Sequence, residues 1–405
     1  MPGYGRTYWA ERTPMARRRS HKTWRGTGAA DVVVIGGGLT GCAAAWVFAS
    51  AGLDVVLLEA DRLASGGTAA GIGAVVPQPD AWFRTVEAAA GLRVARTAWT
   101  TARRSALDLR AALSRLRIRC DLAVAPLVIN APTSTDAAFL RREQTARRAA
   151  GIVSPSLTAA AAAGEIGSES AGALRIADAF VVDPVRAALG FAAAAAKNGA
   201  RLFEHSAVRR TRFTRRHADV VLANGSIRTR LIYVATAGPA AVFSPLARHV
   251  RQEDAYAVVT EPLPAAMRRS VGRRQAVLTE AGDAGPWLRW LGDDRALFLG
   301  GRSRPAPVRQ RDRALVAHTA DLMYQLSVRY PVVSGLAARW GWRVPLVSTA
   351  DGLPWIGAHR NYPFHFFAMA FGVHGEGLAW HAARAALRHL NGDSRREDDA
   401  FGFLR

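Results

Sequence analysis

Continuous apolar runs and helical spacings alternate along the first half of the chain. Runs at 31–35, 54–59 and 231–235 have hydrophobic residues at successive positions, which predicts strands buried on both faces of a sheet. Apolar residues at helical spacing predict helices at 42–50, 79–116, 137–150 and 183–198, with a short one near 157–163. Alternating strands and helices are typical of an α/β fold with a parallel sheet.

The second half has a different pattern. Residues 252–302 contain four short predicted strands, at 255–260, 276–279, 287–291 and 296–299, separated by Pro and Gly, which predict an antiparallel sheet in a second lobe. Strands are also predicted at 201–204, 217–222 and 227–230, with a hairpin turn at Asn224-Gly225. Helices at 311–329 and 378–390 complete the pattern, the second of them after a strand at 364–370.

The first predicted strand leads into a turn with the spacing G-x-G-x-x-G, in which Gly36, Gly38 and Gly41 hold the glycine positions. Gly36 permits the tight turn, Gly38 lets the backbone approach a pyrophosphate, and Gly41 lets helix and strand pack closely. The helix N-terminus attracts phosphate through its free N–H groups. Glu59, 18 residues after Gly41, is placed to accept hydrogen bonds from an adenosine ribose, which favours FAD or NAD over NADP. A glycine-rich turn of another α/β protein is the alternative.

Two further segments of small residues suit a planar ligand. The loop 65–73 has little to bury, as required where backbone lies flat against a ring, although an ordinary flexible loop has the same composition. Near the C-terminus a strand, a glycine turn at 372–377 and a helix follow one another. The N-terminus of that helix is a second place for negative charge.

Charge and cysteine content limit the partners, the metal sites and the compartment that we expect. The 405 residues include 54 basic and 32 acidic ones, a formal net charge of +22, but the arginines are scattered and no aromatic–basic motif interleaves them, so a nucleic-acid partner is disfavoured. Two cysteines provide neither a disulfide framework nor a metal cluster, and no apolar run reaches the roughly 18 residues that span a bilayer. We therefore predict a cytoplasmic protein without a metal site. Residues 1–29 form a basic arm in which Tyr8 and Trp9 are candidate anchors.

Together these motifs resemble the D-amino-acid oxidase-like family of FAD enzymes, which includes glycine, sarcosine and γ-glutamylputrescine oxidases, over nearly the whole chain. The resemblance also rests on the segments 235–238, 256–263, 299–301, 351–357 and 371–375. It implies a Rossmann-like FAD-binding domain formed by 30–80, 150–245 and 335–400, interleaved with an antiparallel-sheet (α+β) substrate domain at 81–149 and 246–334. Position by position, the FAD contacts it implies are Gly36, Gly38, Leu39, Thr40, Gly41, Glu59, Ala60, Ser65, Thr68, Ala69, Ala70, Gly71, Val208, Thr236, Ala237, Gly238, Gly357, Gly372, His374, Gly375, Glu376 and Gly377.

The resemblance also implies a reaction. The flavin N5 would take a hydride from the carbon beside the nitrogen of a small amine or amino acid, leaving an imine that water hydrolyses. Amide N–H groups around Gly375 and Gly377, with His374 beside them, would stabilise negative charge on the reduced ring. Arg343 or Arg289 would bind a substrate carboxylate. The electron acceptor would be O2 or a quinone, and FAD would be non-covalent because neither cysteine is obviously placed to link it.

The flavin-facing loop departs from the pattern of these oxidases, since Ser65-Gly-Gly-Thr-Ala-Ala-Gly71 stands where they usually have Ser-Gly-Arg-Asn-Gly-Gly. Because this loop lies near the substrate, the resemblance leaves substrate identity open. Trp82, Trp342 and Trp355 are candidates for a cavity wall, although core packing explains a tryptophan equally well. Two alternatives also stay open: a flavin oxidase acting on a modified tRNA base, and a flavin-binding protein without catalysis.

Overall fold

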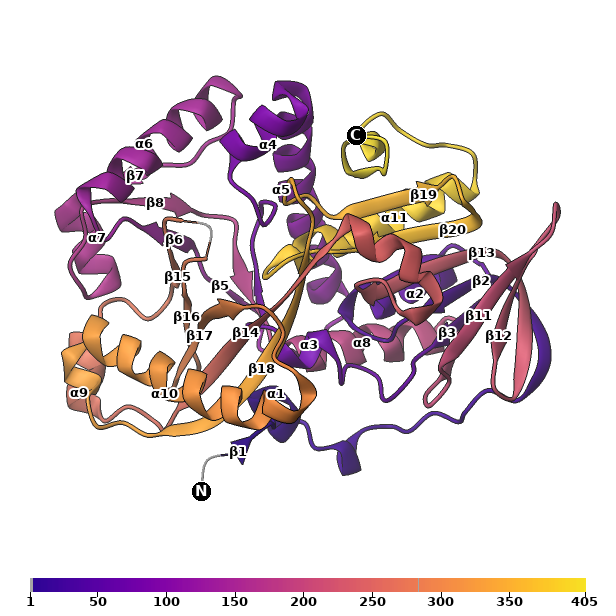
Figure 1. Ribbon diagram of the computed structural model, residues 1–405, viewed down its shortest axis with the longest axis horizontal. Helices are drawn as coiled ribbons and strands as arrows, with labels where there is room; N and C mark the ends of the chain where they lie inside the picture. Colours follow the sequence, from indigo (N-terminus) through magenta and orange to yellow (C-terminus); the bar gives the residue numbers. More distant parts are fainter. Residues whose placement is uncertain (1–2, 283) are drawn as a thin grey trace.

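The computed structural model describes residues 3–282 and 284–405, in which two large sheets lie side by side with helices around them (Figure 1). The central strands of one sheet run parallel, and most neighbours in the other run antiparallel. The predicted α/β class with an antiparallel-sheet lobe is therefore confirmed. Met1 and Pro2, at the start of the predicted arm, lie outside the described residues.

The eight-stranded sheet contains the first glycine turn. Its order is β10 (Arg201–Phe203), β3 (Val55–Leu58), β2 (Gly26–Ile35), β13 (Gly225–Ala237), β12 (Ala218–Leu222) and β11 (Val208–Phe213), and β20 (Tyr362–Met369) pairs with both β13 and β19 (Trp355–His359). Strands β10, β3, β2, β13 and β20 run parallel to one another. The hairpin predicted at Asn224-Gly225 joins β12 to β13, where Leu222 pairs with Gly225. The two strands predicted at 227–230 and 231–235 are one continuous strand, β13.

Both faces of this sheet are buried, as the continuous apolar runs predicted. Val32 and Val34 pack in one hydrophobic cluster, and Val33 and Ile35 pack in another on the opposite face. Helices α2 (Leu39–Ser50), α8 (Pro184–Lys197) and α11 (Ala379–Leu390) belong to the first cluster and pack against each other. A 3-10 segment, Ala241–His249, contributes Phe243 and Leu246 to the second.

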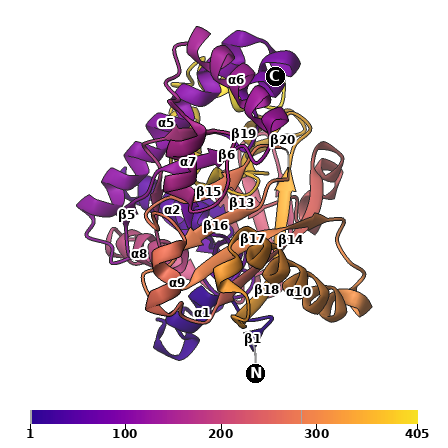
Figure 2. The same cartoon turned by 90° about the vertical axis from the view of Figure 1, so that its left-hand side faces the viewer.

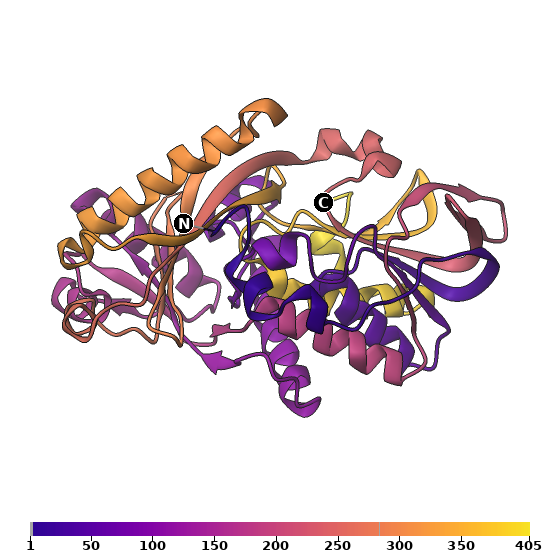
Figure 3. The same ribbon diagram turned by 90° about the horizontal axis from the view of Figure 1, so that it is seen from below.

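The nine-stranded sheet forms the other lobe. Its order is β1 (Gly3–Tyr4), β18 (Ala338–Ser348), β14 (Arg251–Thr260), β17 (Ala296–Ser303), β16 (Trp287–Trp290), β15 (Val277–Glu280), β6 (Leu127–Asn130), β8 (Ala173–Ile176) and β7 (Ser156–Leu157). Helix α10 (Arg311–Arg329) covers its outer face with Leu315, Leu322 and Leu326, and the inner face turns toward the rest of the molecule. Figures 2 and 3 show α10 lying along the outside of this sheet.

The remaining elements connect and cover the two sheets. Strands β4 (Ala74–Val75), β9 (Phe180–Val181) and β5 (Ala123–Val124) form a small third sheet. The helix predicted at 79–116 is two helices, because Gly91 has a φ of +85° and ends the first of them. The other helices are α1 (Tyr8–Arg12), α3 (Gly67–Ala70), α4 (Phe83–Ala90), α5 (Leu92–Arg115), α6 (Ser134–Ala149), α7 (Ala159–Ile166) and α9 (Ala265–Ser270), with 3-10 turns at Met15–Arg17, Val308–Gln310, Pro331–Val333, Gly375–Leu378 and Asp398–Phe401.

Some strands inside the predicted FAD-binding ranges do not belong to the eight-stranded sheet. Strands β7 and β8, inside the predicted FAD-binding range 150–245, pair in the nine-stranded sheet, as does β18 inside 335–400. The pairing of β8 with β6 and of β18 with β14 was not visible in the sequence, because the partner strands are distant along the chain. The arm at 1–29 is anchored at the candidate residues, since Tyr8 and Trp9 are both buried.

Candidate functional site

A cavity of about 390 Å³ lies at the ends of β2, β3 and β13 and extends to the turn after β20. We call it the glycine-turn cavity. Thirteen of the predicted cofactor residues line it: Gly36, Gly38, Leu39, Thr40, Glu59, Ala60, Thr68, Gly71, Val208, Thr236, Ala237, Gly372 and Glu376. Residues outside the predicted set of FAD contacts complete the wall, among them Gly37, Gly66, Phe243, Leu346 and Phe371. The structure thus brings the three predicted glycine-rich segments to one place.

Each glycine of the first turn is required by a close approach. A Cβ on Gly36, whose φ is +107°, would lie 2.4 Å from the carbonyl oxygen of Ala235. A Cβ on Gly41 would lie 1.9 Å from the carbonyl oxygen of Gly36, so helix α2 contacts the strand directly. A Cβ on Gly38 would lie 2.9 Å from the Thr68 hydroxyl, so a side chain at this position would fill the space between turn and loop. The close packing at Gly36 and Gly41 agrees with the roles that the spacing predicted, and the approach of Gly38 to a pyrophosphate stays a prediction.

Hydrogen bonds hold the turn open toward the cavity. The Glu59 carboxylate accepts from the backbone N–H of Gly37 at 2.7 Å and from that of Asp61 at 2.9 Å. The Thr68 hydroxyl accepts from the N–H of Leu39 at 2.8 Å, which satisfies one of the free donors at the start of α2. An acid at the end of β3 and a small-residue loop therefore both reach the same helix terminus.

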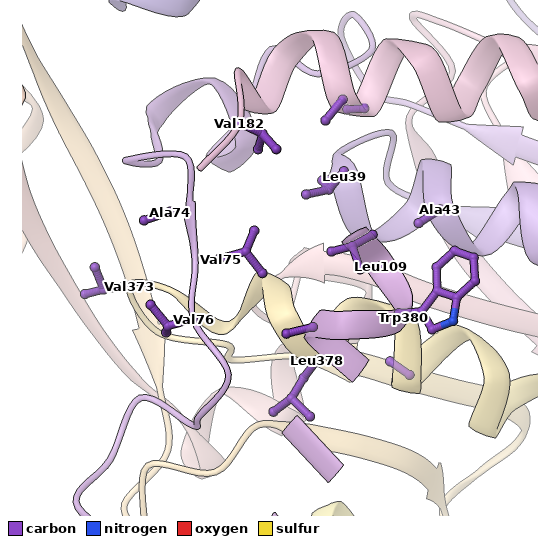
Figure 4. Close-up of a cluster of buried hydrophobic side chains, with 14 of the residues drawn as sticks. Leu39, Ala43, Ala74, Val75, Val76, Leu109, Val182, Val373, Leu378 and Trp380 are labelled. Atoms are coloured by element: carbon purple, nitrogen blue, oxygen red, sulfur yellow. The ribbon is translucent and has the colours of Figure 1, made fainter. Parts of the chain in front are cut away.

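The loop after Glu59 is fixed from behind by two tryptophans. Trp9 in α1 donates its indole N–H to the carbonyl oxygen of Gly71 at 2.8 Å, and Trp342 in β18 donates to that of Ala70 at 3.0 Å. Both indoles are almost fully buried. Side chains from this region, α2, α5 and the start of α11 form one buried cluster, in which Figure 4 labels Val75, Leu109 and Leu378. The loop is therefore an ordered wall, and Trp342 serves it as a buried hydrogen-bond donor.

Nine of the predicted cofactor residues do not line the glycine-turn cavity: Gly41, Ser65, Ala69, Ala70, Gly238, Gly357, His374, Gly375 and Gly377. Close packing explains some of them, since a Cβ on Gly375 would meet Phe371 at 2.5 Å and one on Gly377 would meet the Val76 carbonyl at 2.8 Å. Gly357 lies in β19 opposite Phe367. Their predicted contacts with FAD stay predictions.

A second cavity, of about 400 Å³, lies between the inner face of the nine-stranded sheet and the loops before α4 and after β18. We call it the His374 cavity. Besides His374, its wall includes the predicted candidate Trp82 and several charged or aromatic residues: Asp80, Arg251, Glu253, Glu280, Trp287, Arg302 and Asp351. Trp355 lies elsewhere, stacked on Phe403 with 4.8 Å between ring centroids.

His374 is held on two sides within this cavity. Its Nε2 lies 3.1 Å from Asp80 Oδ1, and its ring lies 4.8 Å from that of Trp287, centroid to centroid. The other Asp80 oxygen accepts from the N–H of Val373 at 2.9 Å and lies 3.7 Å from an Arg302 guanidinium nitrogen. Burial alone would raise the pKa of Asp80, but the attraction of His374 and Arg302 and these hydrogen bonds outweigh it, so the pKa lies below its usual range. Asp80 is therefore ionised at neutral pH.

The two arginines predicted to bind a carboxylate lie outside the His374 cavity. Arg289 is buried and donates from Nη1 to the carbonyl oxygens of Ile72, Gly73 and Val182 at 2.8–2.9 Å. Burial lowers the pKa of Arg289 to about 10, which leaves it charged. Its guanidinium therefore holds the loop.

Arg343 also has another partner. It bonds to the buried carboxylate of Asp254 at 2.7 Å, and its neighbours Trp342 and Val344 pack in the main buried cluster on the other face of β18. Neither arginine lines the His374 cavity, and the predicted role of each in binding a carboxylate stays a prediction.

Arg302 and Asp80 are two charged residues of the His374 cavity that the sequence analysis did not single out. Arg302 directly follows the predicted motif 299–301, so adjacency to that motif was an available signal. Asp80 has no comparable signal, because its role depends on the fold bringing it to His374, 294 positions further along the chain.

Glu376 is the one acidic group at the boundary of the glycine-turn cavity with a strongly shifted pKa. Burial raises the pKa of its carboxyl to about 7, with a smaller contribution from Asp80, while His374 opposes the shift. One carboxyl oxygen, Oε2, is buried without a hydrogen-bond partner in the described structure. An orphaned acceptor beside a glycine-lined cavity is what the edge of a bound polar ring system would satisfy.

The cavity fits the predicted FAD on these observations. It combines a helix terminus with free donors, glycines whose side-chain space is left open, an acid at the ribose position and an unsatisfied polar atom. Within residues 3–282 and 284–405, no group of His, Cys, Asp and Glu is arranged to hold a metal ion. No helix in this described part is long and apolar enough to cross a membrane.

Comparison with known proteins agrees with this geometry. Gamma-glutamylputrescine oxidoreductase of Escherichia coli (strain K12) is 26% identical over 373 residues, which cover 91% of this chain and 85% of that protein. Glycine oxidase from Geobacillus kaustophilus has a similar structure, with a TM-score of 0.78 and 20% identity over 93% of this chain and 99% of that one. L-proline dehydrogenase from P. horikoshii also has a similar structure, with a TM-score of 0.74 and 18% identity over 93% of this chain and 96% of that one. The two structural similarities show a shared fold.

The family itself follows from a match along most of the chain. The family model described as FAD dependent oxidoreductase (DAO) matches residues 31–388, from β2 through most of α11. The protein therefore belongs to the DAO family of FAD-dependent oxidoreductases, and FAD is its cofactor.

Proposed function

We propose that the protein oxidises the CH–NH bond of a small amine or amino acid by hydride transfer, with hydrolysis of the resulting imine. The names of the relatives support this class of substrate, since they refer to gamma-glutamylputrescine, glycine and L-proline, each of which contains an amine. FAD, when bound, supplies the hydride acceptor. The roles proposed below belong to the chain's own residues.

The observation that carries the proposal is that one short segment lines both cavities. Phe371, Gly372, Val373 and Glu376 line the glycine-turn cavity, while His374 lines the second one. A cofactor held by the three glycine-rich segments and a substrate in the His374 cavity would therefore meet at this segment. Such placement, more than a strong protein base, is what hydride transfer requires.

Two residues of the His374 cavity have proposed roles in binding. Arg302 binds the carboxylate of an amino-acid substrate, in place of the predicted Arg289 and Arg343, because a guanidinium forms bidentate hydrogen bonds with carboxylate. Asp80 positions His374 through the 3.1 Å contact with Nε2.

His374 is the proposed acceptor of a proton from the substrate. Its Nδ1 is buried without a hydrogen-bond partner in the described residues, and we assign this atom to take the proton of a substrate ammonium. Loss of that proton is needed because only the neutral amine releases a hydride readily.

The test is an anaerobic screen of amines and amino acids against the purified holoprotein. A substrate will bleach the visible flavin absorption, and the imine product will release ammonia or an amine. Re-oxidation by O2 with formation of hydrogen peroxide, or by a quinone, will identify the acceptor. A bound flavin that no amine bleaches would instead support a non-catalytic flavin-binding protein.

The +22 net charge motivates a second candidate, an oxidase of a modified tRNA base, although the arginines are scattered along the chain. It predicts tRNA binding with a steep salt dependence and no bleaching by free amino acids. The same preparation tests whether FAD is non-covalent, because denaturation will then release it. The burial of both cysteines, neither of which lines the glycine-turn cavity, supports that expectation.

A further inference from the structure

A third cavity, of about 340 Å³, is lined by residues of α5, of α11, which packs against α5, and of the segment 395–397. We call it the arginine hollow. It shares no lining residue with the glycine-turn cavity or the His374 cavity. The family assignment and the proposed amine oxidation leave it without a role.

The hollow concentrates positive charge. Five guanidinium groups line it: Arg104, Arg115, Arg384, Arg388 and Arg395. Three carboxylates oppose them: Asp108 and Glu397 in the lining, and Asp398, which forms an ion pair with Arg388. Arg104 and Arg384 have no ion-pair partner in the described part of the chain. Arg104, Arg115, Arg384 and Arg395 are exposed, so solvent screens part of their mutual repulsion, and an anion bound between them would relieve the rest.

A buried polar group points to the same conclusion. His381, in the first turn of α11, is 7% exposed and lines the hollow. Its Nε2 forms no hydrogen bond, although it lies 3.5 Å from Asp398 Oδ1. Burial lowers the pKa of His381 to about 4, so its ring is neutral at pH 7. A buried ring nitrogen without a partner costs free energy that a hydrogen-bonded ligand would recover.

We propose that the arginine hollow binds a compact phosphorylated anion, held by Arg104 and Arg384 with His381 at its base. Guanidinium groups form paired hydrogen bonds with phosphoryl oxygens, and a multivalent phosphate matches several of them at once. The volume suits a small molecule. The wall made by Trp380, which stacks on Trp46 at 5.6 Å, gives an organic phosphate an apolar surface.

A ligand in the arginine hollow would contact both α5 and α11. The Ser105 hydroxyl in α5 accepts from the backbone N–H of His381 at 2.9 Å, so α5 already caps the first turn of α11. Helix α11 begins directly after Gly375–Leu378, the segment that follows His374. An anion contacting Arg104 on α5 and Arg384 on α11 would strengthen this junction, so we expect it to stabilise the folded protein.

The experiment is calorimetric titration of the holoprotein with inorganic phosphate, pyrophosphate and ribose 5-phosphate, in chloride buffer at constant ionic strength. We expect one site per chain with a dissociation constant of about 1 mM or tighter for at least one of them. Ribose 5-phosphate binding more tightly than inorganic phosphate would identify a phosphate ester as the ligand; the reverse order would identify phosphate itself.

The variant Arg104→Gln/Arg384→Gln should weaken binding at least about tenfold. Its matched control is Arg209→Gln/Arg212→Gln, which removes two exposed arginines of β11, outside the hollow, and should leave binding unchanged. The single variants Arg104→Gln and Arg384→Gln are titrated as well. The thermal unfolding midpoint of each variant shows whether it is folded. Equal binding by the two double variants, or no saturable binding up to about 10 mM, would overturn the proposal.

Discussion

The glycine-turn cavity and the His374 cavity are neighbours of similar size, but they are built in different ways. The first is largely backbone and small side chains, contributed by segments whose spacing is recognisable in the sequence. The second is built from charged and aromatic side chains that come from separate loops and strands. A cofactor common to a family needs the same backbone surface each time, whereas a substrate is distinguished by individual side chains.

The largest effect is expected where the cavities meet. Gly372 has a φ of +73°, and a Cβ there would lie 1.9 Å from Asp80 Oδ2. Gly372→Ala should therefore displace both Asp80 and the His374 segment, lowering the free energy of unfolding by about 3–4 kcal/mol and abolishing FAD retention. Chemical denaturation and the flavin content after gel filtration measure the two effects.

Gly392→Ala is the matched control for this change. Gly392 has a nearly equal φ of +75°, but nothing lies within 4 Å of its Cβ position. It should cost about 1 kcal/mol, the strain of a left-handed alanine alone. Similar losses for the two variants would show that Asp80 does not occupy the place described.

The next largest effect is expected on KM, for which substitutions of Arg302 and Arg343 should give different results. Arg302→Gln should raise KM for an amino-acid substrate about 30–100-fold, equivalent to about 2–3 kcal/mol, because one carboxylate loses its cation. Arg343→Gln should leave KM unchanged and lower stability, since it removes the cation beside the buried Asp254. Steady-state kinetics and thermal unfolding distinguish the two outcomes. An increase of KM in Arg343→Gln alone would contradict the proposed role of Arg302 and support the predicted role of Arg343.

A smaller effect is expected on the pH dependence of the free energy of unfolding, through Glu376 in the glycine-turn cavity. Because burial raises the pKa of Glu376 to about 7, the folded apoprotein holds a proton that the unfolded chain releases above its ordinary pKa. The free energy of unfolding should therefore fall by about 1–2 kcal/mol as pH rises from 5 to 8. Urea denaturation of the apoprotein at each pH measures this slope, and Glu376→Gln should remove that part of it. A slope unchanged by the substitution would assign the titration to another group.

The fold was predictable where local pattern and long-range pairing agree. The run at 31–35 and the helix at 311–329 appear at those positions because burial on both faces and helical spacing leave one choice of structure. No strand was predicted at β6 or β18. The apolar run of β6 is only four residues long, and the alternating apolar residues of β18 are interrupted by Gly341 and Pro345. The predicted domain ranges stay a prediction, although the pairing of β7 with β8 and of β8 with β6 was not predictable, because such short strands are defined by their partners.

The candidate site divides in a similar way. Gly36, Gly41 and Glu59 were found because their geometry follows from neighbours along the chain. Arg289 and Arg302 show the limit: both lie on strands of the same sheet near a predicted motif, but only the three-dimensional path decides which of them reaches the cavity. In a chain with so many arginines, residue type alone gives no preference.

The smallest expected effect tests whether the N-terminal arm supports the cofactor side. Trp9→Phe keeps an aromatic ring but removes the N–H that Gly71 accepts, leaving a buried carbonyl without a donor. The affinity for FAD should fall about fivefold, or about 1 kcal/mol, with KM for the amine unchanged. Trp24→Phe removes the same kind of bond, from the Trp24 indole to the carbonyl of Gly26, at a site that lines neither cavity. Fluorescence titration of both apoproteins with FAD decides the point, because an equal loss in the two variants would mean that the arm acts on general stability and leaves the loop geometry unaffected.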